Sequence, residues 1–235
     1  MRINKYFTEH GVCSRREADK WIESGRIKIN GRIAKLGDQV QPDDKVYIDD
    51  KLFTPPAKKP IIIAYHKPVG IECTSDPRVK NNIIEAVGFP ERLVHIGRLD
   101  VMSEGLILLT NLGDIVNKIL RRHFGHQKEY IVEFSEDISE AQIEKLSRGV
   151  DIGDEVGPTL PCPVEKLARK RLRIILTEGR NRQIRRMSEA VGLKVTRLKR
   201  IRVMNIELGD LKRGTYRHLT KAEMKELMSK LDSQT

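Results

Sequence analysis

The sequence predicts an α+β protein of two domains, a small one over residues 1–52 and a larger one over residues 61–235. Strand-like and helix-like hydrophobic patterns are mixed along the chain instead of being confined to separate halves. A proline-rich segment at residues 53–60 separates the two domains. The chain has 235 residues, 39% of them hydrophobic, which is enough apolar material for a buried core.

The small domain is expected to contain two helices followed by a hairpin. Ser14 is a typical helix N-cap, with a glutamate three residues later, and Gly25 is a typical signal for the end of the helix that follows. Residues 26–33 then alternate charged and apolar side chains around the pair Asn30-Gly31, which favours a tight turn between two strands. Another short strand is expected soon after this hairpin.

The segment between the domains holds three prolines and two lysines in eight residues, a composition typical of a stiff, extended spacer. At the other end of the chain, residues 221–231 predict a helix with Thr220 as its N-cap and Glu223 at capping-box spacing. We expect the other elements of the large domain as strands at residues 61–65, 106–110, 130–134 and 172–176, and as helices at residues 115–120 and 140–147.

The charge of the chain points to an acidic partner. The formal net charge is +11, the pI is about 9.6, and residues 165–202 alone contain fourteen Lys or Arg against three Glu. No apolar run approaches the ~18 residues of a membrane-spanning helix, and the N-terminus lacks the apolar core of a signal peptide. We therefore expect a cytosolic protein whose partner is nucleic acid and not a membrane.

The cysteines and histidines give no evidence of a metal site. Cys13, Cys73 and Cys162 are odd in number and widely spaced, so they match neither a zinc pattern nor a disulfide framework. We expect them to be reduced and mostly buried. His123 and His126 stand three residues apart, but no third ligand is near them, so a polar loop is the better interpretation and no metal is expected.

The segment that carries chemistry is residues 97–106, Gly-Arg-Leu-Asp-Val-Met-Ser-Glu-Gly-Leu, which places Asp100 close to an arginine just before an apolar strand. Taken alone, it would be read as a surface loop with a local ion pair. Three other segments change that interpretation. They are His-Lys-Pro-Val-Gly at residues 66–70, Lys-Glu-Tyr at residues 128–130, and Glu-Gly-Arg-Asn-Arg-Gln-Ile-Arg-Arg-Met at residues 178–187.

In this order and spacing, these segments resemble the pseudouridine synthases of the RsuA branch, which pair an S4 RNA-binding domain with a catalytic domain. The small domain resembles the S4 domain through Ser-Arg-Arg-Glu-Ala at residues 14–18 and Gly-Arg-Ile-Lys-Ile-Asn-Gly at residues 25–31. The resemblance covers nearly the whole chain. It implies a catalytic domain with a mostly antiparallel mixed sheet and flanking helices, acting on ribosomal RNA. Residues 109–120 and 126–130 look most like members that modify large-subunit (23S) rRNA, and small-subunit members are the alternative.

The resemblance also implies roles for single residues. Asp100 matches the catalytic aspartate, Tyr130 matches the tyrosine that packs on the target base, and Arg185 matches the basic residue that pairs with the aspartate. Arg98 matches the arginine that helps to hold the flipped-out state. No cofactor is implied, and no glycine-rich cofactor or phosphate loop is present.

Further candidate RNA contacts follow from charge and from position in these segments. They are Arg15, Arg16, Arg26, Lys28, Lys67, Arg180, Arg182, Gln183, Arg186, Lys199, Arg200 and Arg202. Arg15 and Arg16 stand at a helix N-terminus, where backbone N–H groups also favour phosphate. Lys199, Arg200 and Arg202 are expected to contact phosphates, with an exposed strand of solvated side chains as the alternative.

Three rival functions are open at this point. A non-catalytic RNA-binding or ribosome-assembly factor on the same fold would have no reason to keep Asp100, Tyr130 and Arg185 together. A methyltransferase would need a glycine-rich cofactor loop. A membrane-surface protein would need an amphipathic helix with large apolar residues opposite lysines, whereas the helix at residues 221–231 is short and carries two acidic residues. We expect a monomeric enzyme.

Overall fold

The computed structural model describes residues 1–56, 59–120 and 125–232. The chain divides into two units, Met1–Ile61 with Asn111–Asp114, and Ile62–Thr110 with Ile115–Thr235, which we call the S4 unit and the catalytic unit. Residues 57–58 of the predicted spacer lie outside the described residues, as does His123. The part of the spacer before them is not free of the first unit, because Phe53 packs against its core.

The S4 unit begins with two short helices, α1 (Ile3–Glu9) and α2 (Arg15–Glu23). The predicted N-cap of α2 is confirmed, since Ser14 Oγ accepts the backbone N–H of Glu17 at 3.1 Å. Apolar side chains of both helices pack on the sheet that follows. The buried core of this unit consists of Ile3, Phe7, Cys13, Ala18, Ile22, Ile27, Ile29, Ala34, Val40 and Val46.

The sheet of the S4 unit has the strand order β2-β1-β3-β4 and is antiparallel throughout. The predicted hairpin is present, with Asn30 and Gly31 at φ values of 50° and 83°, the left-handed pair that a tight hairpin turn requires. The strands are β1 (Ile27–Ile29), β2 (Arg32–Ile33), β3 (Val46–Ile48) and β4 (Lys51–Leu52).

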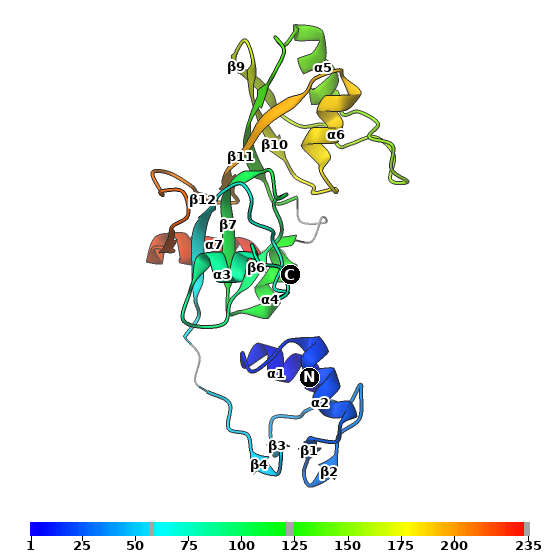
Figure 1. Cartoon of the computed structure of the whole chain (residues 1–235), viewed down its shortest axis with the longest axis vertical. Coiled ribbons are helices and arrows are strands. Elements are labelled where there is room, and N and C mark those ends of the chain that lie inside the picture. Colours follow the sequence, from blue (N-terminus) through cyan, green and yellow to red (C-terminus); the bar gives the residue numbers. More distant parts are fainter. Residues whose placement is uncertain (57–58, 121–124, 233–235) are drawn as a thin grey trace. The chain divides into compact units, whose positions relative to one another are not determined.

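The catalytic unit is built on one large sheet with the strand order β13-β5-β7-β11-β8-β10-β9, with β6 beside β7 and β12 beside β11 (Figure 1). The pairs are antiparallel except for β7 with β11, which agrees with the mostly antiparallel mixed sheet that was expected. The strands are β5 (Ile62–Lys67), β6 (Val94–Ile96), β7 (Glu104–Thr110), β8 (Lys128–Phe134), β9 (Val164–Ala168), β10 (Arg171–Leu176), β11 (Val195–Val203), β12 (Ile206–Glu207) and β13 (Tyr216–His218).

Helices flank this sheet. Strands β5 and β7 are buried along their whole length, as their continuous apolar sequences predict for central strands covered on both faces. Figure 1 shows α5 and α6 beside the end of the sheet that carries β9 and β10. The helices are α3 (Ile83–Val87), α4 (Gly113–Leu120), α5 (Glu140–Arg148), α6 (Gln183–Ala190) and α7 (Lys221–Asp232).

Two local features confirm or explain sequence signals. Thr220 and Glu223 form the predicted capping box of α7, with Thr220 Oγ1 accepting from the Glu223 N–H at 3.2 Å and the Glu223 carboxylate accepting from the Thr220 N–H at 2.8 Å. Gly105, at φ +111°, lets β7 approach β11 closely, because a Cβ there would lie 2.2 Å from the Arg200 carbonyl oxygen. None of the helices in the described ranges is long and apolar enough to cross a membrane.

Candidate active site

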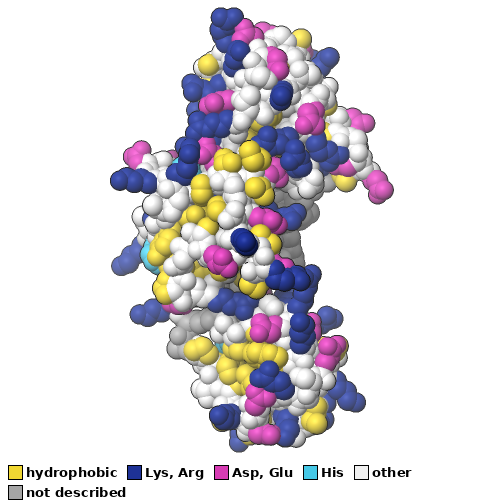
Figure 2. Space-filling view, viewed as in Figure 1, with side chains coloured by type: hydrophobic (Ala, Val, Ile, Leu, Met, Phe, Trp, Pro, Cys, Tyr) yellow, Lys and Arg dark blue, Asp and Glu magenta, His cyan; other side chains and the backbone are white. Residues whose placement is uncertain are grey.

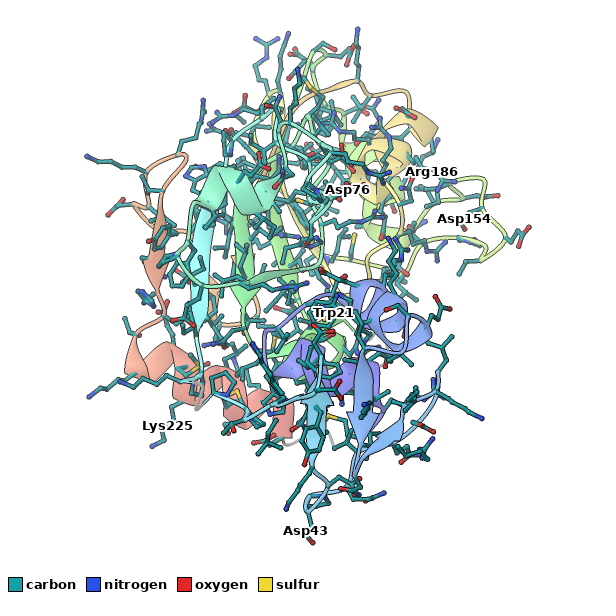
Figure 3. All side chains as sticks on the ribbon, turned by 60° about the horizontal axis from the view of Figure 1, so that its bottom comes forward. Trp21, Asp43, Asp76, Asp154, Arg186 and Lys225 are labelled. Atoms are coloured by element: carbon teal, nitrogen blue, oxygen red, sulfur yellow. The ribbon has the colours of Figure 1, made fainter. Side chains whose placement is uncertain are left out.

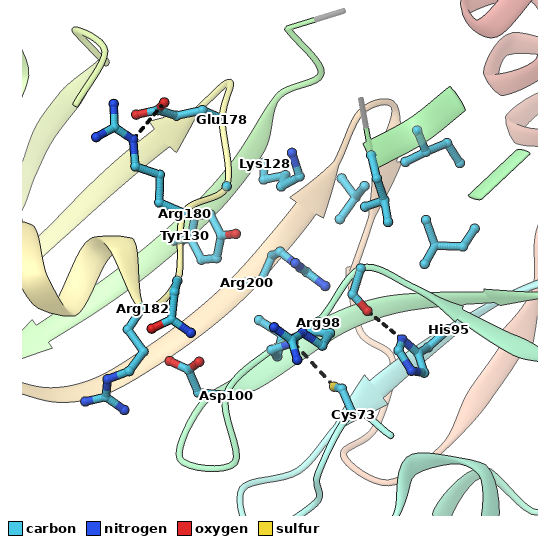
Figure 4. A pocket seen from close by; sticks show the side chains of 18 of the residues that line it. Cys73, His95, Arg98, Asp100, Lys128, Tyr130, Glu178, Arg180, Arg182 and Arg200 are labelled. Carbon is cyan, nitrogen blue, oxygen red and sulfur yellow. Dashed lines mark hydrogen bonds and ion pairs between the residues drawn. The ribbon is translucent and has the colours of Figure 1, made fainter. Parts of the chain in front are cut away.

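A cleft of about 950 Å³ lies in the catalytic unit beside the turn that carries Asp100 (Figure 4). The volume of the cleft is near the upper end of the range for small-ligand pockets, so the cleft can hold a nucleotide and part of the polymer that carries it. Strand β8 contributes Tyr130, and β11 contributes Arg200. The loop before α6 contributes Arg182.

Asp100 stands at the corner of a tight turn that is anchored on both sides. The Ser103 N–H donates to the Asp100 carbonyl at 3.0 Å, and Ser103 is itself buried. On the other side, the Leu99 N–H donates to Cys73 Sγ at 3.3 Å, and the Leu99 side chain is buried. The Asp100 side chain is 30% exposed, so its carboxylate is held at the cleft and is accessible to a substrate.

Arg185 reaches this turn from α6. Its Nε lies 3.7 Å from Asp100 Oδ2, and its Nη2 donates to the Met102 carbonyl at 2.9 Å. The guanidinium side chain is only 12% exposed, and burial lowers the pKa of Arg185, while the charge of Asp100 opposes that shift. Asp100 and Arg185 are therefore held as neighbouring opposite charges beside the cleft.

Tyr130 and Arg98, the other residues with an implied role, also line the cleft. Tyr130 is buried in the middle of β8, opposite Arg200 of β11 and Ile174 of β10. Arg98 is exposed, on the loop that leads from β6 to Asp100. Figure 4 shows Arg98, Asp100 and Tyr130 around one open space. The structure therefore brings together all four residues that the sequence singled out for flipping and chemistry.

Four of the predicted RNA contacts, Lys67, Gln183, Arg180 and Arg186, hold loops of the catalytic unit through their side-chain donors. Lys67 is fully buried and donates to the carbonyls of Pro68 and Ile71, both at 2.8 Å. Gln183 is buried and donates to Glu178 Oε1 at 2.9 Å. The side-chain donors of Lys67 and Gln183 hold loops of the protein in place. We therefore no longer expect these two residues to contact RNA.

Arg180 and Arg186 complete this internal network around the loop of Asp154. Arg180 pairs with Asp154 at 3.1 Å and with Glu178 at 3.3 Å, and its guanidinium also donates to the carbonyls of Gly157 and Pro158. Arg186 pairs with Asp154, which lies near it in Figure 3, at a distance of 3.5 Å. Arg186 also donates to the carbonyl of Ile152. We also remove these two arginines from the expected contacts, because their donors already have acceptors.

The run of Lys199, Arg200 and Arg202 is not a uniform exposed surface either. A β-bulge between Arg200 and Arg202 interrupts the alternation of β11, so the two arginines do not share a face. Arg200 is buried and lines the cleft. Arg202 pairs with Glu129 at 2.7 Å and donates to the Met204 carbonyl at 2.7 Å. Lys199 is half-buried.

The remaining predicted contacts are placed at the surface. In the catalytic unit, Arg182 is exposed and adopts a left-handed φ of 49° at the N-cap of α6. In the S4 unit, Arg15 and Arg16 are exposed on the first turn of α2.

The other two predicted contacts of the S4 unit, Arg26 and Lys28, are paired with acids. Arg26 binds Asp49 through two hydrogen bonds, and Lys28 binds Asp50. Figure 2 shows Lys and Arg side chains over both units, with acidic side chains between them. Exposed ion pairs of this kind contribute little to stability, so they leave the cations available to an incoming phosphate.

Lys128 and His95 also line the cleft, and neither was predicted as a site residue from the sequence. Lys128 stands two residues before Tyr130 on β8, so strand alternation could have placed it on the same face. His95 Nδ1 donates to the Gly97 carbonyl oxygen at 2.8 Å, and burial lowers the pKa of His95. The three cysteines are buried, as expected. Within the described ranges, no cluster of three or more His, Cys, Asp or Glu could hold a metal ion.

The fold and this site match a known class of enzyme. The family model described as RNA pseudouridylate synthase matches residues 61–190, and the model of the S4 domain matches residues 1–46. The chain therefore belongs to the RNA pseudouridine synthase family, in the form that carries an S4 domain at its N-terminus. The expected fold and enzyme class are both confirmed by these matches.

Individual relatives cover almost the whole chain. The dual-specificity RNA pseudouridine synthase RluF of Escherichia coli (strain K12) is 45% identical over 99% of this chain and 80% of its own length. The ribosomal large subunit pseudouridine synthase B of Shigella flexneri is 35% identical over 94% of this chain and 80% of its own length. A crystal structure of a pseudouridylate synthase superposes with a TM-score of 0.72 at 31% identity, covering 97% of this chain and 99% of that one.

Proposed function

We propose that the protein converts specific uridines of ribosomal RNA to pseudouridine, with Asp100 as the catalytic carboxylate. The observation that carries this proposal is the pairing of Asp100 with Arg185 at 3.7 Å in a cleft that Tyr130 also lines. A carboxylate, a fixed guanidinium and an aromatic face are the three groups that the reaction needs in one place. A binding-only relative would not need this set.

The chemistry assigns tasks to Asp100 and Tyr130, and Arg185 supplies the fixed positive charge beside Asp100. The reaction breaks the bond between the sugar C1′ and N1 of uracil, turns the base, and joins C1′ to C5. A proton leaves C5 and N1 gains one, so the product is an isomer of the substrate. Asp100 acts on the sugar either as a nucleophile or by removing a sugar proton, and both routes need the ionised carboxylate. Tyr130 offers a flat face to the base and a hydroxyl near it. No electrons or groups are gained, so the isomerisation needs no cofactor.

The target base must first leave its stack, at a cost of a few kcal/mol. We assign Arg98 to stabilising the flipped-out state, because it is exposed, lines the cleft and stands two residues before Asp100. Its guanidinium can stack in the vacated position and donate hydrogen bonds there. The S4 unit adds phosphate contacts through Arg15 and Arg16, which carry no sequence information but hold the RNA.

Ribosomal RNA is the proposed substrate because one of the two named relatives is named for a ribosomal subunit and the other for RNA in general. One is named for the large ribosomal subunit, and the relative at 45% identity is named as a dual-specificity enzyme. We propose large-subunit rRNA as the main target of this chain. A second RNA target is compatible with the dual specificity for which one relative is named. A small-subunit target is the alternative.

Asp100→Asn tests the chemistry. The substitution should abolish isomerisation and leave RNA affinity within about tenfold, because the shape and the basic surface remain. Asp137→Asn is a matched control, since Asp137 forms an exposed ion pair with Arg169 outside the cleft, and it should keep full turnover. Measurable turnover by the Asp100→Asn protein would show that another group performs the reaction.

The substrate is tested by mapping pseudouridines in the ribosomal RNA of cells with and without the protein. At least one large-subunit pseudouridine should disappear without the protein and return with the wild-type gene but not with Asp100→Asn. A loss confined to small-subunit RNA would contradict the large-subunit proposal. An unchanged map of both subunits would favour the assembly-factor alternative.

A further inference from the structure

Two cations inside the cleft, Lys128 and Arg200, have no acidic partner among the described residues. Both lie on the cleft face of the sheet, because Lys128 is two residues from Tyr130 on β8 and Arg200 is the direct cross-strand neighbour of Tyr130 on β11. Figure 4 shows the guanidinium of Arg200 between Lys128 and Arg98. None of the tasks assigned above uses either cation.

Arg200 is 3% exposed and only partly satisfied. Its Nε donates to the Leu106 carbonyl at 2.7 Å, which fixes the guanidinium in one orientation. Its Nη2 is buried and has no hydrogen-bond partner within the described part of the chain. A buried donor without an acceptor destabilises a protein by about 1–3 kcal/mol, and more when it is charged, so the arrangement calls for an acceptor from outside the chain.

Lys128 is in a similar position. Its Nζ donates one hydrogen bond, to the His126 carbonyl at 3.2 Å, and the ammonium has two further hydrogens. Burial, followed by repulsion from Arg200, lowers the pKa of Lys128 to about 8. An anion bound between the two cations would satisfy the free donors of both and would remove their mutual repulsion.

We propose that Lys128 and Arg200 form an anion site that binds a phosphate of the RNA backbone next to the flipped-out uridine. This rests on the proposed function, because the cleft that holds Asp100 and Tyr130 is where the uridine would lie. Every nucleotide is joined to its neighbours by phosphates close to its sugar. A phosphate is therefore the anion that arrives with the substrate, and fixing it would set the position of the sugar against Asp100.

The neighbouring arginines make this pair distinct. Arg180 has Glu178 and Asp154, and Arg185 has Asp100, so each of these arginines has a carboxylate of its own. The acids close to Lys128 in sequence face elsewhere, since Glu129 pairs with Arg202 on the opposite face of the sheet. The free positive charge of the cleft thus gathers at Lys128 and Arg200, with the exposed Arg98 and Arg182 at its rim.

Steady-state kinetics with unmodified ribosomal RNA transcripts test the site. A phosphate contact is present both before and during the reaction, so Lys128→Met should raise KM by about tenfold or more and leave kcat within a few-fold of wild type. Arg200→Lys, which keeps a charge but removes Nη2, should do the same to a smaller extent. Lys170→Met is the matched control, because Lys170 is exposed beyond the cleft, and its KM should not change. A lower kcat at unchanged KM would indicate that the two cations stabilise negative charge that develops in the uracil during the reaction. That result would overturn the assignment of a phosphate site.

A second measurement needs no isomerase activity and therefore separates this proposal from the proposed function. About 20 mM inorganic phosphate should raise the Tm of the wild-type protein relative to chloride at equal ionic strength, because a ligand that binds only the folded state stabilises it. The Tm of Lys128→Met should respond less, and that of Lys170→Met should respond like the wild type. Equal responses of the wild type and Lys128→Met, or no response of either, would overturn the anion site even if the enzyme isomerises uridine.

Discussion

Arg180 and Arg200 line the same cleft, but their surroundings are opposite in character. The guanidinium of Arg180 is enclosed by two carboxylates, Glu178 and Asp154, and by two backbone carbonyls. The guanidinium of Arg200 has one carbonyl and a buried nitrogen with no acceptor within the described ranges. The donors of Arg180 are used to hold the protein's own loops together, whereas Arg200 retains a donor that can bind an acceptor from outside the chain.

The difference shows that the charge excess of residues 165–202 serves two purposes. A basic stretch in a sequence indicates an acidic partner, but some of its arginines hold loops together through carbonyls and acids far away in the chain. Hydrogen-bond partners, and not charge or exposure alone, separate the two kinds. Exposure by itself would have grouped Arg180 with Arg200, since both are largely buried.

The largest expected effect is on stability, at the enclosed arginine. Arg180→Met leaves the Glu178 carboxylate buried without its cation, and breaking a buried pair in this way typically destabilises a protein by about 3–5 kcal/mol. The free energy of unfolding, measured in urea, should fall by that order. Arg169→Met removes an exposed pair with Asp137 and should change the same quantity by about 1 kcal/mol or less. Similar losses of unfolding free energy in Arg180→Met and Arg169→Met would contradict the claim that Arg180 is part of an internal network that stabilises the protein.

A second prediction concerns Arg185, which combines the two roles. Arg185→Lys keeps the positive charge near Asp100 but cannot reproduce a planar group that faces Asp100 through Nε and the Met102 carbonyl through Nη2. Misplacement of a catalytic group by about 1 Å can lower the rate on the order of a hundredfold, so kcat should fall strongly. RNA affinity and its salt dependence should stay close to wild type. Wild-type turnover would show that charge alone is sufficient at this position.

A third prediction compares two arginines of one motif in RNA binding. Arg182→Gly removes an exposed side chain and also relieves the left-handed backbone, which glycine accepts, so folding should not suffer. If Arg182 contacts a phosphate, the slope of log affinity against log salt should decrease by roughly 0.7 to 0.9. Arg186→Ala should leave this slope unchanged, because Arg186 is bound to Asp154 and to the Ile152 carbonyl. Equal changes in both slopes would contradict the assignment of internal partners.

Much of the fold followed from local sequence signals. The continuous apolar strands at β5 and β7, the Asn30-Gly31 turn, and the capped helix α7 were predicted because a few adjacent residues determine each of them. Strand β11 was considered only as an alternative for its last residues, and its bulge was not foreseen. A bulge depends on the pairing with β8, which no local pattern encodes.

The candidate site was predictable where a motif is specific and unpredictable where partners are distant. The resemblance placed Asp100 and Arg185 together, and the structure has them 3.7 Å apart. The internal role of Arg180 depends on Asp154 and on carbonyls more than twenty residues away, so the motif alone could not distinguish it from an RNA contact. Lys128 could have been found, because strand alternation places it on the same face as Tyr130.

The smallest expected effect is on the pH dependence of RNA affinity, in which Lys128 should differ from a lysine of ordinary pKa. Because the pKa of Lys128 is lowered to about 8, its ammonium is largely charged at pH 7 and largely neutral at pH 9, whereas RNA phosphates stay ionised. RNA affinity should therefore weaken a few-fold between pH 7 and pH 9, because one charged contact is lost.

The free energy of unfolding of the free protein should change in the opposite direction and increase with pH. The unfolded chain, with lysine at its ordinary pKa of about 10.4, binds more protons than the folded chain above about pH 8, so the contribution of this residue to stability rises with pH there. Lys128→Met should flatten both trends, and Lys170→Met should leave both in place. A wild-type affinity that is constant from pH 7 to pH 9 would show that a charged Lys128 does not contact the RNA.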